Sequence, residues 1–369
     1  MKDFARQLLK WFVAGKRDLP WRRLQHDPYA VWVSEIMLQQ TTVAAVIPFY
    51  NKWMTRFPTV QSLAESPLDD VLKHWAGLGY YARARNLHKG AGVVVSEHDG
   101  QVPSDPRRLL ALPGIGRYTA GAILSIAFNQ DAPILDANVI RVLARVHAVT
   151  GDPKTSAATQ KKLWRLAEEA LPAGRAGEFN EALMELGALV CEAGAPRCGT
   201  CPVSEMCSAK QRGDPTSYPQ FSGTKKWLDV EDVSVAVRNS AQGVLLVQRS
   251  PDLPLWGGLW EMPRVTRQDG ESLECCALRA VHESVGLPIS AAVPFGVLKH
   301  VVANRRITLH GFEALLGVEA LAEIERETGS SATCAWVTQQ TRNDYALATP
   351  QVKLTELLFQ QEKQGRLEL

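Results

Sequence analysis

Hydrophobic residues recur with a helical period through the first part of the chain. The clearest segments carry Ala120, Ile123, Leu124 and Ala127, and then Val139, Ile140, Leu143 and Val146. This spacing is typical of helices that bury one face, and Pro and Gly residues separate the segments. No stretch before residue 213 alternates apolar and polar positions as a half-buried strand does. The pattern therefore predicts an all-α domain over residues 1–212.

The pattern changes class after a stretch that lacks apolar periodicity. Residues 213–229 contain a run rich in Pro, Ser and Gly and are expected to form a linker. Beyond it, the pattern predicts strands over 233–237, 244–247 and 306–312, a turn over 239–243 and a helix over 272–285. The fold class is therefore multidomain, with the all-α domain followed by an α+β domain over 230–369.

Composition narrows the class of protein. The chain has 369 residues, of which 46% are hydrophobic, so it is long enough for two domains or more with buried cores. No charge-free apolar run is long enough to span a bilayer, so no membrane contact is expected. Seven cysteines are an odd number, which indicates a reducing compartment. These observations lead us to expect a soluble cytosolic protein.

The net charge of +2 hides a difference between the two parts of the chain. Residues 1–226 hold 28 Lys and Arg against 21 Asp and Glu, or +7, whereas residues 227–369 hold 13 against 18, or −5. Only the first part has the positive excess that favours contact with a polyanion such as DNA.

Four cysteines lie close together in the sequence with the spacing C-x6-C-x2-C-x5-C. They are Cys191, Cys198, Cys201 and Cys207. Four thiolates in one short loop can surround an iron-sulfur cluster or a single zinc ion, and the spacing alone leaves both open.

A glycine-rich turn over 112–120 precedes this loop. Gly114 and Gly116 permit a positive φ and close approach of the backbone, and a helix is expected to follow. The free N–H groups at the start of such a helix can bind a DNA phosphate. The alternative is a tight turn between two helices with no ligand.

Two carboxylates are expected to have different environments. Glu35 has Trp32, Ile36 and other apolar neighbours, and burial among them would raise its pKa toward that of a general acid. Asp136 directly precedes a predicted helix, whose N–H groups and dipole favour the ionised form. The alternatives are a solvated glutamate on an amphipathic helix and an ordinary N-cap.

The string LPGIGRYTAGA resembles the helix-hairpin-helix of the endonuclease III superfamily of DNA glycosylases. Many members of this superfamily carry a 4Fe-4S cluster on cysteines with the same spacing, so the resemblance implies such a cluster in the loop 191–207 of this chain. Bifunctional members have a lysine after Gly-x-Gly-Arg that forms a Schiff base, whereas this chain has Tyr118. The resemblance therefore implies base excision without an efficient strand cut. SEIMLQQT, GLGYYARARNLH, ILDANVIRVLAR and FNEALMELGA resemble MutY-type adenine DNA glycosylases.

This resemblance implies a role for each matching residue. Glu35 would protonate a flipped adenine, Asp136 would stabilise the sugar cation, Asn138 would orient the aspartate or water, and Tyr118 would hydrogen-bond near the scissile bond. The residues expected to bind DNA or the base are Trp21, Arg22, Leu38, Gln40, Thr41, Tyr80, Gly114, Gly116 and Glu181, with Gln40 and Tyr80 filling the gap in the stack. If the family match fails, Gln40 is a helix-surface amide and Tyr80 a core aromatic. The implied partner is double-stranded DNA in which adenine is mispaired with 8-oxoguanine or guanine.

The segment from Trp256 to about residue 287 resembles a Nudix fold with an incomplete metal-binding box. Alignment on Arg279 retains Glu271 and Glu283, but Val265, Ala280 and Ser284 replace a glycine and two glutamates. We therefore expect no Nudix hydrolysis.

The second domain also resembles the lesion-reading domain of MutY-type enzymes. Its reading loop departs from the usual Phe-Ser-His because it offers Val302, Ala303 and Asn304, so Asn304 or His300 would have to replace the serine hydroxyl.

Two other functions are consistent with parts of the sequence. One is a thymine-mismatch or oxidised-pyrimidine glycosylase of the same superfamily, which the MLQQT context of Glu35 disfavours. The other is a DNA-binding protein that has lost catalysis, which the presence of both Glu35 and Asp136 disfavours.

Overall fold

The computed structural model describes residues 2–223, 226–239, 243–253, 255–286, 289–315 and 334–363. The chain divides into two compact units, Met1–Glu65 with Asn86–Thr224 and Ser66–Arg85 with Lys225–Leu369. The predicted limits at 212 and 230 thus remain a proposal, and one segment of the helical region is grouped with the second unit. Within that unit, Arg85 Nη1 donates to the carbonyl of Gly257 at 2.7 Å.

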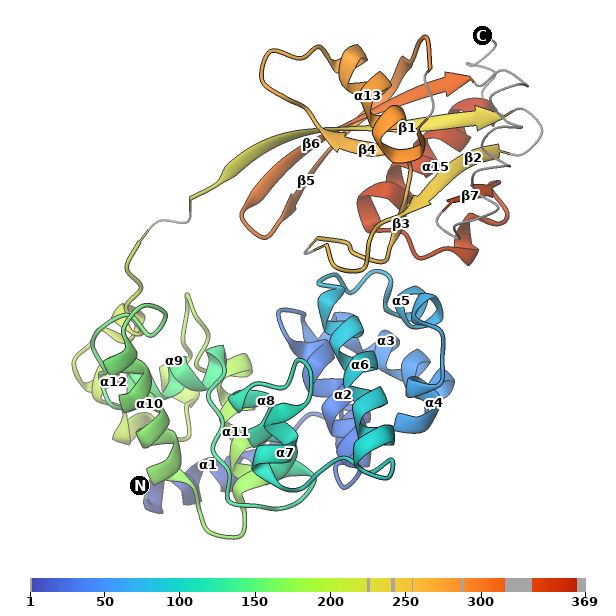
Figure 1. Cartoon of the computed structure of the whole chain (residues 1–369). Coiled ribbons are helices and arrows are strands. Elements are labelled where there is room, and N and C mark those ends of the chain that lie inside the picture. The colour runs from blue at the N-terminus through green and yellow to red at the C-terminus, as the bar shows by residue number, and fades with distance from the viewer. Residues whose placement is uncertain are drawn as a thin grey trace. The chain divides into compact units, whose positions relative to one another are not determined.

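The first unit is helical, as predicted, and the first strand among the described residues begins at Leu228 (Figure 1). Its helices are α1 (Lys2–Gly15), η1 (Pro20–Leu24), α2 (Pro28–Leu38), α3 (Val43–Arg56), α4 (Val60–Ala64), α6 (Ala82–Glu97, from its residue 86), α7 (Pro106–Ala111), α8 (Arg117–Ile126), α9 (Ala137–Val146), α10 (Ala157–Ala170), α11 (Ala176–Leu189), η2 (Cys198–Thr200), η3 (Ser204–Met206), α12 (Ser208–Gln211) and η4 (Pro215–Ser217).

Helix α11 lies at the centre of this unit and packs against α1, α8 and α9. Two glycines make the close approach possible. A Cβ on Gly177 would lie 2.6 Å from the carbonyl oxygen of Ser125, and one on Gly187 would lie 2.6 Å from Cβ of Asn138. Because Gly187 has no side chain, the first turn of α9 lies directly against α11. Phe4, Leu143, Phe179 and Leu183 are among the buried residues of this core.

Helices α7 and α8 form the predicted hairpin. Gly114 has φ +77°, and a Cβ there would lie 2.7 Å from Cβ of Asn86, so a larger residue is excluded by both conformation and space. Gly116 differs from the expectation, because it is the N-cap of α8 with φ −95°. The first N–H groups of α8 follow it, and both glycines are exposed.

The second unit contains α5 (Leu68–Trp75) and a mixed sheet in the order β3-β2-β1-β6-β5. Its strands are β1 (Leu228–Asn239), β2 (Gly243–Gln248), β3 (Trp260–Glu261), β4 (Arg264–Thr266), β5 (Val293–Val302), β6 (Arg305–Leu315) and β7 (Cys334–Val337). Strands β1 and β6 pair in parallel, β4 adds to β1, and β7 adds to β2. The other helices are α13 (Leu273–Val285), η5 (Arg342–Asp344) and α15 (Thr349–Lys363).

Alternation along β1 explains why the sheet has a helix on each face. Val233, Val235 and Val237 pack with residues of α13 such as Ala277, whereas Ala236 packs with residues of α15 such as Leu354. A strand buried on both faces therefore separates two apolar cores.

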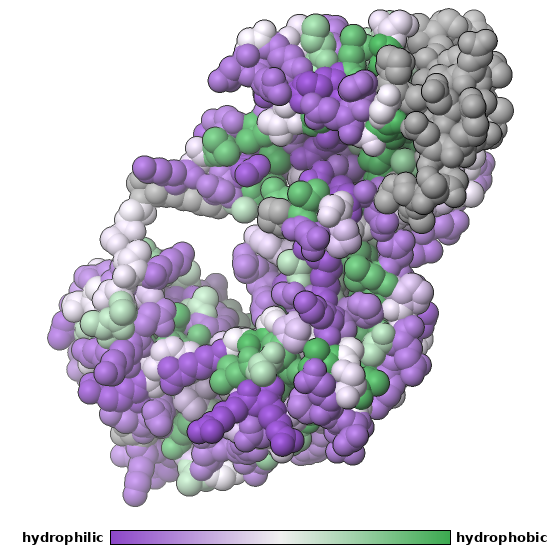
Figure 2. Space-filling view, viewed as in Figure 1, coloured by the Kyte–Doolittle hydropathy of each residue, from purple (hydrophilic) through white to green (hydrophobic). Residues whose placement is uncertain are grey.

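On the face seen in Figure 2, hydrophilic residues predominate over the described parts.

The predicted elements of this unit are confirmed with small shifts of their ends. The stretches 233–237, 244–247 and 306–312 lie in β1, β2 and β6, and β1 pairs with β2 antiparallel as a hairpin. The helix expected over 272–285 is α13, capped by the Ser272 side chain. Of the turn expected over 239–243, residues 240–242 lie outside the described residues, as do 224–225 of the linker.

None of the helices in the described ranges is long and apolar enough to cross a membrane.

Candidate active site

A cavity of about 650 Å³ lies in the first unit between η1, α2, the hairpin, α9 and α11. It brings together residues that are distant in the sequence. The predicted site residues that line it are Trp21, Arg22, Glu35, Leu38, Gln40, Thr41, Gly114, Gly116, Tyr118, Asp136, Asn138 and Glu181. Tyr80 belongs to the second unit.

Glu35 is a buried carboxylate on α2 with 5% of its surface exposed, which excludes a solvated residue on a helix surface. Burial raises the pKa of Glu35 to about 7, the hydrogen bond from Tyr118 lowers it in part, and the negative charges of Asp136 and Glu181 raise it. The Tyr118 hydroxyl donates to Oε2 of Glu35 at 2.5 Å. The carboxyl group can therefore be protonated near neutral pH, as expected from the apolar sequence around it.

Asp136 is the N-cap of α9 and faces the same cavity. Its Oδ1 accepts from the backbone N–H of Val139 at 2.7 Å, and its Oδ2 accepts from Nδ2 of Asn138 at 3.0 Å. Burial raises the pKa of Asp136 above its ordinary value, even though these hydrogen bonds and Arg141 lower it. The sequence argument gave weight only to the helix N-terminus, so it missed that desolvation outweighs the donated N–H groups.

Arg141 holds Asn138 in place and was not found from the sequence. Its Nη2 donates to Oδ1 of Asn138 at 2.7 Å and to the carbonyl of Gly187 at 2.8 Å, and its Nε donates to the carbonyl of Cys191 at 2.7 Å. One guanidinium thus connects the residue beside Asp136 with the start of the cysteine loop. Its position three residues after Asn138 on the expected helix was the available signal.

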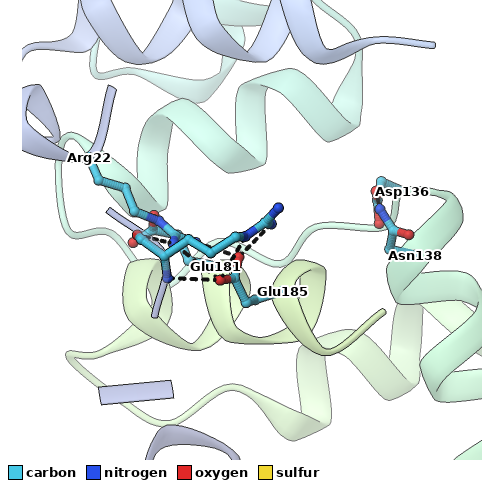
Figure 3. Close-up of polar contacts among 6 residues, drawn as sticks. Arg22, Asp136, Asn138, Glu181 and Glu185 are labelled. Atoms are coloured by element: carbon cyan, nitrogen blue, oxygen red, sulfur yellow. Dashed lines mark hydrogen bonds and ion pairs between the residues drawn. The ribbon is translucent and has the colours of Figure 1, made fainter. Parts of the chain in front are cut away.

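A cluster of four charged side chains forms another part of the cavity wall (Figure 3). Arg22 Nε donates to Glu181 at 2.8 Å, and Arg22 Nη2 donates to Glu185 at 3.1 Å. Arg17 Nη2 donates to Glu185 at 2.7 Å. Burial raises the pKa of Glu181, although Arg22 lowers it in part. The family resemblance in the sequence pointed to Arg22 and Glu181 but not to Arg17 and Glu185. Glu185 could have been found because it lies one helical turn after Glu181.

Gln40 and Tyr80 have the same uncommon backbone conformation. Their φ angles are +57° and +47°, and such values in residues other than glycine are concentrated at functional sites. Gln40 follows the C-cap of α2 and is exposed, so it is not an amide on a helix surface. Tyr80 has 48% of its surface exposed, so it is not a core aromatic. Both side chains are exposed, and the guanidinium of Arg83 lies 5.7 Å from the Tyr80 ring centroid.

The four thiols of the loop line one small cavity beside α9 and α11. Arg145, which is 2% exposed, fixes the loop because its guanidinium donates to the carbonyls of Cys191, Glu192 and Ala193 at 3.2, 2.7 and 2.8 Å and to Sγ of Cys191 at 3.3 Å. Burial, together with the charges of the other three thiols, raises the pKa of Cys201 to about 11, although the backbone N–H of Val203 lowers it in part. All four cysteines are free of disulfides. In the described part of the chain, no three His, Cys, Asp or Glu side chains are placed to hold one metal ion.

In the second unit, the two retained carboxylates of the Nudix box are paired with a cation. Glu271 accepts from Nε and Nη2 of Arg279 at 2.8 Å each, and Glu283 accepts from Nη1 at 3.1 Å. The hydrogen bonds from Arg279 lower the pKa of Glu271 to about 2. Ala280 and Ser284 have no carboxylate to replace the missing glutamates, and both retained carboxylates of the box are engaged by Arg279.

The expected reading loop is the tight turn between β5 and β6. Ala303 has φ +54°, and Asn304 Nδ2 donates to the carbonyl of Lys226 at 3.4 Å. His300 is half-buried beside the Trp256 ring, with ring centroids 5.9 Å apart. The Asn304 amide therefore already has a partner within its own unit, and the His300 ring is less accessible than the turn.

Comparisons with known proteins agree with this arrangement. Residues 33–169 match the family model described as HhH-GPD superfamily base excision DNA repair protein, and residues 233–357 match the NUDIX domain. A solved thermostable thymine-DNA glycosylase superposes on 57% of this chain and 96% of its own, with a TM-score of 0.53 and 32% identity. The helical unit therefore has the fold of a helix-hairpin-helix DNA glycosylase.

Curated relatives define the family more narrowly. Adenine DNA glycosylase of Rattus norvegicus is 37% identical, and the match covers 98% of this chain and 79% of the relative. Adenine DNA glycosylase of Buchnera aphidicola is 38% identical, and the match covers 72% of this chain and 75% of the relative. The chain belongs to the adenine DNA glycosylase family.

Proposed function

We propose that this protein is a monofunctional DNA glycosylase that removes adenine paired with 8-oxoguanine, or with guanine, during base excision repair. The observation that carries the proposal is the pair of carboxyl groups in one cavity, in which Glu35 has a pKa raised to about 7 and Asp136 sits at a helix N-terminus. The curated relatives support adenine as the base that is released.

The two carboxyl groups can act on opposite sides of one bond. Breaking the bond between a base and deoxyribose leaves negative charge on the base and positive charge on the sugar, so the base needs a proton and the sugar needs a nearby anion. Glu35 is suited to supply the proton because its carboxyl group is buried and hydrogen-bonded to Tyr118. Asp136 is suited to supply the anion, and Asn138 orients it. The protonated base leaves, and water then adds to the sugar cation and releases a proton that restores the acid.

Base release without strand cleavage rests on Tyr118. Its phenol cannot form the imine that a lysine forms at this position, and its hydroxyl is already engaged with Glu35. Borohydride reduction during turnover should therefore trap no more than a trace of enzyme on DNA. Strong trapping by the wild type would show that another lysine attacks the sugar.

The similarity to a thymine-DNA glycosylase gives a specific reason to test a second substrate. The deciding experiment is release of free base from duplexes that carry adenine opposite 8-oxoguanine, adenine opposite guanine, or thymine opposite guanine. We expect adenine release in the first two duplexes and little thymine release. Efficient thymine release would favour the thymine-mismatch glycosylase, and no release from any duplex would favour the catalytically inactive DNA-binding protein.

The four thiols are suited to a 4Fe-4S cluster, with Cys191, Cys198, Cys201 and Cys207 as ligands. Their common cavity and the buried Arg145 beside it fit an anionic, thiolate-bound group. When bound, the cluster would fix the loop that follows α11. Protein purified without oxygen should be yellow-brown with about four irons per chain. Zinc in place of iron would identify a structural zinc loop.

The second unit is proposed to read the base opposite adenine, with double-stranded DNA as the partner. Its Nudix fold supports a nucleotide-reading role, whereas the Arg279 pairing speaks against hydrolysis. A monomer in the cytoplasm, associated with the nucleoid in a bacterium, remains part of this proposal.

A further inference from the structure

Glu185 is a buried carboxylate of the active-site cavity that the proposed chemistry does not use. It lies on α11 one turn after Glu181, and its surface is 2% exposed. Its Oε1 accepts from the backbone N–H and Nε of Arg17 at 3.0 Å each, and its Oε2 accepts from Nη2 of Arg17 at 2.7 Å and Nη2 of Arg22 at 3.1 Å. A carboxylate has about four acceptor sites, so protein donors occupy those of Glu185.

Glu185 therefore acts on Arg22 rather than on a substrate. Arg22 is held at three points, because its Nη1 donates to the carbonyl of Arg17 at 2.9 Å, its Nη2 to Glu185 and its Nε to Glu181 at 2.8 Å. Figure 3 shows the Arg22 side chain pointing toward the cluster that contains the two glutamates of α11. Without Glu185, the freed edge of the guanidinium could turn to Glu181 and bind both of its oxygens, which is the favoured geometry of an Arg–carboxylate pair.

The arrangement leaves one carboxylate oxygen open to the cavity. Oε1 of Glu181 accepts from Arg22, whereas Oε2 of Glu181 has no hydrogen-bond partner within the described ranges of the chain. Adenine carries an exocyclic amine next to a ring nitrogen, that is, a donor beside an acceptor. An open carboxylate oxygen can accept a hydrogen bond from this amine, whereas a base with a carbonyl in place of the amine would face the carboxylate with an acceptor.

We propose that Glu185 is a positioning residue that sets selectivity for a 6-amino base, because it holds Arg22 so that one oxygen of Glu181 stays available to the amine. The inference rests on the proposed adenine glycosylase function. Arg17 has a supporting part, since it fills the remaining acceptor sites of Glu185.

The test compares Glu185→Gln with the wild type under single-turnover conditions. The duplexes carry adenine, or unsubstituted purine that lacks the amine, opposite 8-oxoguanine. A hydrogen bond to a charged group is worth enough to change a rate by about tenfold to a hundredfold, so adenine release should slow by that factor. Purine release should change by less than about threefold, because purine makes no bond to Glu181. The ratio of adenine to purine rates should therefore fall about tenfold or more.

A matched control lies on the same helix. Glu178 forms an exposed ion pair with Arg175 at 2.6 Å, so Glu178→Gln removes the same charge outside the cavity and should leave the ratio unchanged. If Glu185 acts through Arg22, the double variant Arg22→Met/Glu185→Gln should have the same ratio as Arg22→Met alone. Glu185→Asp keeps the charge but shortens the reach to Arg22, so it should give an intermediate ratio and serves if Glu185→Gln does not fold.

An unchanged ratio of adenine to purine rates would overturn the inference. If Glu185→Gln, or Glu185→Asp in its place, slows release of both bases equally, Glu185 has a structural role only. If it slows neither, Glu185 does not act on the base. Failure of the proposed function has a different signature, because the wild type itself would then release no adenine.

Discussion

The two units of this protein place glutamates in opposite electrostatic environments. Glu35 in the helical unit is buried without a cation, and burial raises its pKa to about 7. Glu271 in the Nudix-like unit accepts two hydrogen bonds from Arg279, which lower its pKa to about 2. The same kind of carboxyl group can therefore hold a proton near neutral pH in one unit, whereas it is ionised in the other. The comparison shows that burial without a counter-charge raises the pKa of a carboxyl group, whereas hydrogen bonds from an arginine lower it.

The largest expected effect comes from removing the proton donor. Glu35→Gln cannot protonate the leaving base, so adenine release should fall by ~10²–10⁴-fold while binding to duplex DNA is retained. Single-turnover base release and a gel-shift measurement test the two parts. Activity within a few-fold of the wild type would remove Glu35 from the mechanism.

The pH dependence of base release should reflect Glu35 and not Glu271. The proposed mechanism requires the protonated form of Glu35, so base release should decline as pH rises through about 7, by about tenfold per unit at high pH. Arg279→Met in the other unit should not move this profile. A rate that is flat from pH 6 to 9 would contradict a Glu35 with a raised pKa, provided that chemistry limits the rate.

Glu35 and Glu271 should contribute to the free energy of unfolding with opposite dependence on pH. Glu35 loses its proton near pH 4.5 when unfolded and near pH 7 when folded, so its burial lowers stability as pH rises through this window. Glu35→Gln should therefore be more stable than the wild type at pH 8, by up to about 3 kcal/mol. Urea unfolding at pH 5 and pH 8 measures the difference, which should shrink toward pH 5. Equal differences at both pH values would show that burial of the charge is not the cause.

The Glu271–Arg279 pair should behave in the reverse way. Because the folded pKa of Glu271 is depressed to about 2, its stabilisation is present above about pH 4.5 and is lost as pH falls toward 2. Arg279→Met should lower the free energy of unfolding of the second unit by on the order of 1 kcal/mol at pH 7, with adenine release unaffected. Slower adenine release in this variant would indicate that the second unit also supports the chemistry.

The smallest expected effect concerns the reading turn. Replacing Val302-Ala303-Asn304 by Phe-Ser-His adds a hydroxyl donor, and a neutral hydrogen bond contributes about 0.5–1.5 kcal/mol net. The preference for 8-oxoguanine over guanine should therefore rise only several-fold, measured as the ratio of the two single-turnover rates. A preference that does not change would place the reading of guanine elsewhere.

The sequence by itself determined the elements and much of the chemistry. Periodicity predicted the helices of the first unit, and alternation predicted β1 because Val233, Val235 and Val237 must share one face of a strand. Motifs that are local in sequence carry their own physics, so the hairpin turn and the cysteine loop were recognisable.

Only the tertiary structure decided which groups meet and what surrounds them. Glu35 and Tyr118 are 83 positions apart, and Arg17 and Glu185 are 168 apart, so no local pattern links them. The pKa of Asp136 was misjudged for the same reason, because its helix cap is local whereas its desolvation comes from the whole cavity wall. Local sequence specifies backbone hydrogen bonds and periodicity, whereas burial and charge pairing depend on segments that only folding brings together.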